Sequence, residues 1–293
     1  MNPPNFTNKQ DKVCKECFLD ILVHKFKSSL RSNLKIWKDD LNLVCISGGS
    51  NSMGMLNMLY KSLFGNNQNR KMFFRVHILY IDEGPAVYNH TEEQHQANLA
   101  LIKQVCTSYQ FTYTIVPLES VYDLEAPAEE GGQWYLDMRA GDPETTQKIE
   151  EEKKKDEETH TQQDESVKLI ANSVVHVEDI EKKRKNLREL MECLPTISNS
   201  REDLILYLKR WLIASFALKY NFKKILFGTT GHKVATQLLA QLAKGRGASI
   251  AHEISYIDDK NFDGRLTFMN PLREFLHKEI ALYNHINKVE IMP

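Results

Sequence analysis

Three short apolar segments in the first half of the chain alternate with stretches of helical periodicity. The apolar segments are residues 41–47, 73–82 and 111–118, and amphipathic patterns over 52–64 and 91–110 separate them. Nearly continuous apolar strands that alternate with helices are typical of a parallel sheet with helices on both faces. The sequence therefore predicts an α/β fold with a doubly wound parallel sheet.

The same alternation returns in the last third of the chain. A helix is expected over 200–221, a strand over 222–230, a helix over 231–247, and then a fifth strand and a final helix divided by Pro271. Proline cannot continue a strand ladder or a helix interior, so it marks that boundary. These segments complete the same α/β domain.

A segment rich in mixed charge separates the two halves. It contains runs such as EEEKKKDEETH and is low in aromatic residues, which is the composition of a solvated or disordered insertion. A long exposed helix of Glu and Lys pairs is the alternative. We divide the chain into a disordered lead at 1–13, a cysteine pair and helix at 14–36, the first part of the α/β domain at 37–140, the charged insertion at 141–199 and the second part at 200–293.

The amino-acid composition indicates a soluble globular protein rather than a membrane or secreted one. Hydrophobic residues make up 42% and charged residues 26%, as in ordinary soluble globular proteins, and the formal net charge is −1. A near-neutral chain is not drawn to nucleic acid as a whole, so RNA contact would need a local basic patch. No segment approaches about 18 uninterrupted apolar residues, and the polar N-terminus lacks a signal-peptide core. The 5 cysteines, without an export signal, predict reduced thiols and a cytoplasmic protein with no membrane contact.

The turn Ser47-Gly48-Gly49 links the first strand to the following helix. Such a turn directs several backbone N–H groups to one point, and glycine lets the backbone approach a phosphate closely. Ser47 and Ser52 add hydroxyl donors. The lysine of the P-loop motif is absent, and a turn whose glycines serve only packing is the alternative. Because ligands bind at the carboxyl ends of strands in doubly wound folds, we favour a phosphate site.

Further candidates follow other strands. Asp82 ends the second strand and could hold a ribose hydroxyl or magnesium, or belong to an ordinary turn. Gly231 and His232 follow the fourth strand, and His232 is either an acid–base group or a polar helix cap. Arg246 lies between two glycines, where it could contact phosphate, although those glycines could simply end a helix.

Cys14 and Cys17 form a C-x-x-C pair. Zinc usually takes four ligands, so two unmetallated thiols are as good an interpretation as a zinc site. A redox role is disfavoured because no strand is expected before the pair. None of the other cysteines has the setting of an activated thiolate.

The segment SGGSNSM resembles the PP-loop, S-G-G-x-D-S, of ATP pyrophosphatases with the adenine nucleotide alpha hydrolase-like fold. Five segments in the same order resemble the cytoplasmic tRNA 2-thiolation protein 2 family over most of residues 14–287, apart from the charged insertion. They are CKECFLDILVHKFKSSL, the PP-loop, YIDEG, KGRGAS and NPLREFLHKEIALYN.

This resemblance implies a non-catalytic subunit in a heterodimer with a catalytic thiolase. Together they would 2-thiolate the wobble uridine, as 5-methoxycarbonylmethyl-2-thiouridine, in cytosolic tRNAs for Lys, Gln and Glu. ATP would adenylate the uridine, and a thiocarboxylated ubiquitin-like carrier would supply sulfur. Lys25, Lys27, Arg31 and Lys35, with Lys209, Arg210 and Lys244, could form a basic face for tRNA, although such charges are usually only solvated.

The chain departs from catalytic PP-loop thiolases where chemistry is needed. Asn51 replaces the aspartate of the loop, which removes a charge useful for magnesium, and Ser50 stands where lysine is common. The run GHKVAT keeps Gly231 and His232 but lacks both acids of the family's G-H-N-A-D-D. ATP binding is therefore open, and the nucleotide site is expected to be degenerate.

The thiols of the catalytic members are also missing. Met269 and Asn270 precede Pro271 where those members have cysteine, and no thiol follows the third strand. We therefore predict no catalytic residue and no thiolation by this chain alone. A self-sufficient ATP-dependent PP-loop ligase or sulfurtransferase is the alternative, and a nucleotide-sensing fold without an RNA role is a third. Relatives often have two C-x-x-C pairs and continue beyond the last helix, which weakens the zinc assignment and suggests a fragment or a short form.

Overall fold

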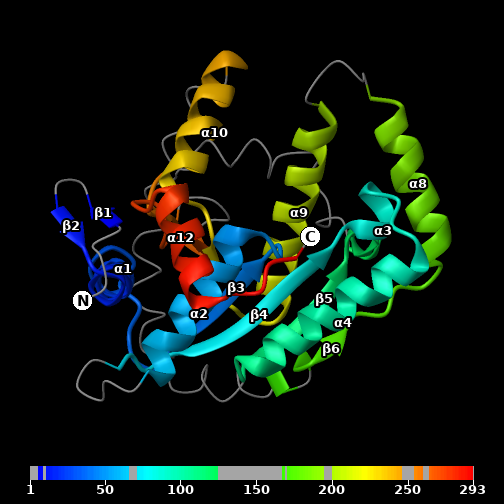
Figure 1. Ribbon diagram of the computed structural model, residues 1–293. Coiled ribbons are helices and arrows are strands. Elements are labelled where there is room, and N and C mark those ends of the chain that lie inside the picture. The colour runs from blue at the N-terminus through cyan, green and yellow to red at the C-terminus, as the bar shows by residue number, and fades with distance from the viewer. Residues whose placement is uncertain are drawn as a thin grey trace.

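The computed structural model describes residues 6–8, 11–65, 71–124, 167–168, 170–194, 200–245, 254–259 and 264–292. Within them, one seven-stranded sheet has the order β6-β5-β4-β3-β7-β9-β8. Figure 1 labels β3, β4, β5 and β6 of this sheet. Its strands are β3 (Leu41–Ile46), β4 (Arg75–Asp82), β5 (Thr112–Pro117), β6 (Ser173–Val174), β7 (Lys224–Phe227), β8 (Ile257–Asp258) and β9 (Thr267–Met269). Neighbours pair in parallel except β8 with β9, so the predicted α/β class with a parallel sheet is confirmed.

The sheet is covered on both faces because its strands are apolar on both sides. Every residue of β3 is buried. Leu43 and Cys45 pack in one hydrophobic cluster, whereas Val44 and Ile46 pack in the other, as the period of two along a strand requires. A sheet with such strands must be covered on both faces, so helices pack against each side of it.

The helices divide between the two faces. One face carries α1 (Lys15–Ser28), α2 (Ser50–Phe64), α4 (Glu92–Ser108) and α12 (His277–Asn287), and the other carries α8 (Ile180–Glu192) and α9 (Ser200–Lys219). Shorter or more exposed are the π-helical turn η1 (Ser29–Asn33), α3 (Gly84–Val87), the 3-10 helix η3 (Leu118–Asp123) and α10 (Gly231–Ala243). Among the helices described, none has the length and apolar character needed to cross a membrane.

Strand order places the glycine turn at a topological switch point. From β3 the chain builds β4, β5 and β6 to one side, and it then returns to add β7 on the other side of β3. In open α/β sheets, a crevice forms at the carboxyl ends of the strands where the order reverses. The turn that follows β3 lies at this point.

Two regions differ from the sequence-based expectation. The lead predicted to be disordered contains an antiparallel pair, β1 (Phe6–Asn8) and β2 (Asp11–Val13). The end of the predicted charged insertion joins the domain, because β6 pairs with β5, and Leu187 and Met191 bury one face of α8. Two apolar side chains one helical turn apart were too weak a signal among so many charges. Residues 141–166 and 195–199 of that insertion lie outside the described residues.

His77 on β4 is fully buried between two threonine hydroxyls. Its Nδ1 lies 2.8 Å from Thr112 Oγ1 and its Nε2 lies 2.9 Å from Thr114 Oγ1. Thr114 donates its own proton to the Ile170 carbonyl, so it accepts from Nε2–H, and Nδ1 accepts from Thr112. Burial lowers the pKa of His77 to about 4, because desolvation disfavours the charged imidazolium.

Stability should therefore fall in mild acid. The unfolded chain protonates His77 near pH 6.5, whereas the folded chain resists protonation down to about pH 4. The contribution is fully present above about pH 6.5 and is lost as pH falls through that window, by about 2 kcal/mol between pH 7 and pH 5. Urea unfolding at both pH values should show this loss, and His77→Gln should remove most of it. His24→Gln, on an exposed helix position, is the control. An unchanged pH dependence in His77→Gln would show that other groups are responsible.

Gly54 lets α12 pack closely on α2. A Cβ at this position would lie 2.7 Å from Asn284 Oδ1 and 2.8 Å from Ile280 Cγ2. Both neighbours are buried, so neither can move away easily.

Gly54→Ala should consequently destabilise the protein. Overpacking of this kind lowers the free energy of unfolding by about 1–3 kcal/mol. The higher helix propensity of alanine raises it by about 1 kcal/mol, so the net effect is destabilising over most of that range. Gly49→Ala is the matched control, because its Cβ would meet only Ser47 Oγ at 3.7 Å. Chemical denaturation of both variants measures the difference, and a Gly54→Ala protein more stable than the wild type would contradict the assigned packing.

Candidate functional site

The turn after β3 is built as a phosphate-binding turn would be. Gly48 has φ +78°, and Gly49 is the N-cap of α2. The first N–H groups of the helix, which have no acceptor within the helix, therefore lie beside the turn. Ser52 is buried and braces the turn: its hydroxyl donates to the Gly49 carbonyl at 2.9 Å and accepts from the Ser47 N–H at 3.3 Å. The buried Ser52 thus stabilises the turn through its two hydrogen bonds, whereas Ser47 and Gly49 are exposed.

Asn51 bridges three segments of the chain. Its Nδ2 lies 3.4 Å from Thr230 Oγ1, just before α10, and its Oδ1 accepts from His277 Nδ1 at 3.1 Å, at the start of α12. Asn51 occupies the position where the resemblance to PP-loop enzymes implies an acid. The side chain that could have held magnesium instead connects α2 to its neighbours.

Close backbone contacts bring the same segments together. A Cβ at Gly228 would lie 2.8 Å from Ser52 Cα, and the Gly231 N–H donates to the Phe275 carbonyl at 3.0 Å. Asn284 Nδ2 donates to the Ser50 carbonyl at 2.7 Å. The structure therefore gathers the turn, the β7–α10 connection and α12 at one edge of the sheet, as the motifs in the sequence predict.

Asp82 lies at the carboxyl end of β4 with both oxygens engaged. Oδ1 accepts from the Gly84 N–H at 3.3 Å and Oδ2 lies 2.6 Å from His95 Nε2. The adjacent Glu83 pairs with Lys209 Nζ at 2.9 and 3.0 Å. These two acids already have partners from the same chain, which favours a structural role for them.

The remaining predicted residues fall elsewhere. His232 is exposed in the first turn of α10 and is not the N-cap, which is Thr230. Arg246 lies outside the described residues. Met292 contacts the turn unexpectedly: its N–H donates to the Gly48 carbonyl at 3.1 Å, and a Cβ on Gly48 would lie 2.3 Å from its Sδ.

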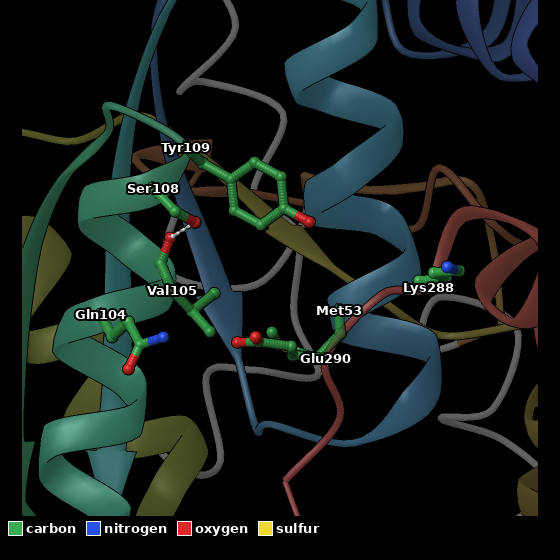
Figure 2. A pocket seen from close by; sticks show the side chains of 7 residues that line it. All are labelled: Met53, Gln104, Val105, Ser108, Tyr109, Lys288 and Glu290. Atoms are coloured by element: carbon green, nitrogen blue, oxygen red, sulfur yellow. Dashed lines mark hydrogen bonds between the residues drawn. The ribbon is translucent and has the colours of Figure 1, made fainter.

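A hollow of about 220 Å³ lies between α2, α4 and the segment after α12. Figure 2 shows the Glu290 side chain directed from that segment toward α4. The lining residues are Met53, Gln104, Val105, Ser108, Tyr109, Lys288 and Glu290. None of the site residues predicted from the sequence lines this hollow.

The cysteines occupy two kinds of position. Cys45 and Cys106 are buried in the core, and burial raises the pKa of the Cys106 thiol to about 12 and that of Cys45 further. Cys14, Cys17 and Cys193 are exposed. Over the described ranges, no group of three or more His, Cys, Asp or Glu side chains could hold a metal ion.

Several residues of the predicted basic face pair within the chain. Lys25 Nζ lies 3.3 Å from Glu279 Oε2, Arg210 pairs with Asp258 at 2.7 Å, and Lys244 pairs with Asp203 at 2.6 Å. Lys209 pairs with Glu83, as described above. Arg31 and Lys35 are exposed beyond α1, and Lys27 is partly buried on α1. An RNA contact there remains a prediction that would depend mainly on Arg31 and Lys35.

Sequence patterns missed the side chains that complete the site. His277 lies inside the segment NPLREFLHKEIALYN and Thr230 directly precedes GHKVAT, but nothing in the spacing assigned either residue to Asn51. Asn284 had a signal, since it is a polar residue one turn from Ile280 on the buried side of a helix. His95 had no signal, because its contact to Asp82 depends on how α4 lies against β4.

No family model matches the chain. Curated relatives do: it is 28% identical over 279 residues to cytoplasmic tRNA 2-thiolation protein 2 of Danio rerio, covering 94% of this chain and 54% of the relative. The same protein of Homo sapiens is 25% identical over 299 residues, covering 95% and 55%. That of Dictyostelium discoideum is 25% identical over 289 residues, covering 97% and 44%. The chain spans about half the length of the curated relatives it matches.

A solved structure shares the fold. The U34-tRNA thiolase NcsA from Methanococcus maripaludis, determined with its [4Fe-4S] cluster, superposes with a TM-score of 0.57 and 11% identity, covering 99% of this chain and 71% of that one. The likeness agrees with the PP-loop architecture predicted from the glycine turn. By sequence the chain is similar over about 95% of its length to cytoplasmic tRNA 2-thiolation protein 2 of several organisms, and it shares the fold of a PP-loop thiolase.

Proposed function

We propose that this chain is a non-catalytic subunit of the cytoplasmic tRNA 2-thiolation machinery, acting as a heterodimer with a catalytic thiolase. The observation that carries the proposal is Asn51, which takes the place of the PP-loop acid and is held by Thr230 and His277. The glycine turn expected of a nucleotide site is present at the end of β3, but the charge that would bind magnesium is absent. The catalytic subunit would then adenylate the wobble uridine of tRNAs for Lys, Gln and Glu and receive sulfur from a ubiquitin-like carrier.

The positions expected to handle sulfur support the same proposal. Met269 is buried in the core at the end of β9. Asn270 is also buried, and its Nδ2 donates to the Ser255 carbonyl at 3.2 Å. Side chains with these packing roles cannot act as nucleophiles, and the buried Cys45 and Cys106 are poor thiolates.

An iron–sulfur cluster like that of the archaeal thiolase does not fit the residues of this chain. Such clusters are held by several cysteine thiolates at one point, and the part of the chain that the structure describes brings no such group together. We therefore assign the cluster-dependent step to no residue here. The zinc assignment for Cys14 and Cys17 gains no further ligand for the same reason.

The glycine turn offers N–H donors that suit the phosphates of ATP, but it lacks the carboxylate that would bind magnesium. A Cβ on the exposed Gly49 would meet only Ser47 Oγ, at 3.7 Å, and the N-terminus of α2 supplies N–H donors. A bound nucleotide would contact backbone at the exposed Ser47 and Gly49, because Met292 covers Gly48, and Asn51 would face it without charge. We propose a retained but degenerate nucleotide site that stabilises the heterodimer or its tRNA complex.

A thiolation assay tests the subunit role. The chain and its cognate catalytic thiolase are purified separately and together, with ATP, the sulfur carrier and unmodified tRNA for Lys. The chain alone should form no 2-thiouridine, because it lacks the acid and the thiols, whereas the pair should form more than the thiolase alone. Mass spectrometry of nuclease-digested tRNA measures the product.

Asn51→Asp is the matched control, because it adds the missing charge but no thiol, so it should remain inactive alone. Thiolation of tRNA by the isolated wild-type chain would contradict the proposal and favour a self-sufficient sulfurtransferase.

Nucleotide titration of the isolated chain tests the turn. ATP should bind saturably without magnesium, and Gly49→Ala should weaken binding by at least about tenfold, because a methyl group would enter the phosphate's approach. The variant should lose about 1 kcal/mol of stability or less. Gly48→Ala is unsuitable, since its positive φ and its contact with Met292 make it a folding variant.

Asn51→Asp should make nucleotide binding depend on magnesium. Calorimetry with and without the metal distinguishes the two proteins. Absence of binding in both would show that the turn is only structural.

A further inference from the structure

The start of α1 combines a strand, a C-x-x-C pair and a helix. The strand β2 ends at Val13, Cys14 is the N-cap of α1, and Cys17 lies in the first turn of that helix. A strand thus precedes the pair, which the sequence did not predict, although it belongs to a two-stranded antiparallel sheet with β1 and not to a thioredoxin-like unit. The strand was missed because Asp-Lys-Val has no apolar pattern, and it exists by pairing with β1.

The two thiols are accessible while the helix that carries them is fixed. Cys14 and Cys17 are both free and exposed. Phe18, Leu22 and Phe26 anchor α1 in the core. The helix end therefore presents both sulfurs to solvent from a fixed position, as an exchange reaction with a soluble partner requires.

The pair is chemically asymmetric. The Cys17 N–H points to Cys14 Sγ at 3.4 Å, so the sulfur of the N-cap residue receives a backbone donor at the positive end of the helix. This N–H and the Cys17 thiol lower the pKa of Cys14, whereas the hydrogen bond to Cys14 raises the pKa of Cys17. Cys14 is thus the group poised to attack, and Cys17 holds its proton until a second step.

We propose that Cys14 and Cys17 form a thiol–disulfide exchange site for small-molecule disulfides, with Cys14 as nucleophile and Cys17 as resolving thiol. The Cys14 thiolate attacks one sulfur of the disulfide, and the S–S bond breaks to release the first thiolate. Cys17 then loses its proton to solvent and attacks Cys14 Sγ, which releases the second thiolate. The substrate disulfide is reduced to two thiols, and the pair is oxidised to a Cys14–Cys17 disulfide.

A redox titration of the full chain with glutathione as the probe tests this site. The reduced protein is equilibrated with oxidised and reduced glutathione at graded ratios, quenched in acid, alkylated and mapped by mass spectrometry. The wild type should form an internal Cys14–Cys17 disulfide. Cys17→Ser should stop at a mixed disulfide of Cys14 with glutathione, because no resolving thiol remains. Cys14→Ser keeps a good N-cap, and its Cys17 should react at least about tenfold more slowly.

Cys193 is the internal control. It is exposed like the pair, but it is the C-cap of α8, where the helix presents carbonyl groups. Three results would each overturn the proposal. One is that Cys14 and Cys193 react with oxidised glutathione at equal rates. Another is that the single thiol left in Cys14→Ser reacts as fast as the single thiol left in Cys17→Ser. The last is stoichiometric zinc on the purified chain that blocks both thiols until it is chelated. Circular dichroism of both variants checks that α1 is retained, and the assay is independent of tRNA thiolation.

Discussion

The burial of β3 on both faces is the constraint from which the rest of the architecture follows. β3 pairs in parallel with β4 on one side and β7 on the other, so its carboxyl end opens at the point where strand order reverses. Any turn placed there faces the crevice of a doubly wound sheet. The chain uses Ser47–Gly49 for that turn, and close contacts at Gly228 and Gly54 allow β7 and α12 to approach it.

Asn51 shows how such a site can keep its shape after its charge is gone. An aspartate at the N-terminus of α2, beside exposed N–H groups, would be available for a cation. The amide instead makes one hydrogen bond to Thr230 and one to His277, which ties α2 to the starts of α10 and α12. An amide both donates and accepts, and therefore one side chain can form hydrogen bonds with both partners at once. An amide at this position lacks the charge of an aspartate and adds a structural contact, which is consistent with the proposed subunit role.

The separation of the cysteines from the turn adds to this division of roles. Core thiols at Cys45 and Cys106 are shielded by burial, whereas Cys14 and Cys17 stand in solvent at the start of α1. Thiol chemistry, where the chain has any, thus belongs to the N-terminal helix. It does not belong to the edge of the sheet where nucleotide would bind.

Local pattern was enough to determine the strand–helix alternation, the glycine turn and the segments that meet around it, because strand burial and helix periodicity are written in neighbouring residues. Pattern failed for β2, β6 and α8, whose few apolar or paired residues are stabilised only by contacts distant in sequence. The partners of the site residues were likewise decided by tertiary structure. The contacts of His95 with Asp82, of His277 with Asn51 and of Met292 with Gly48 each join different elements. A one-dimensional pattern records which face of an element is buried, but it does not record which side chain of another element lies opposite.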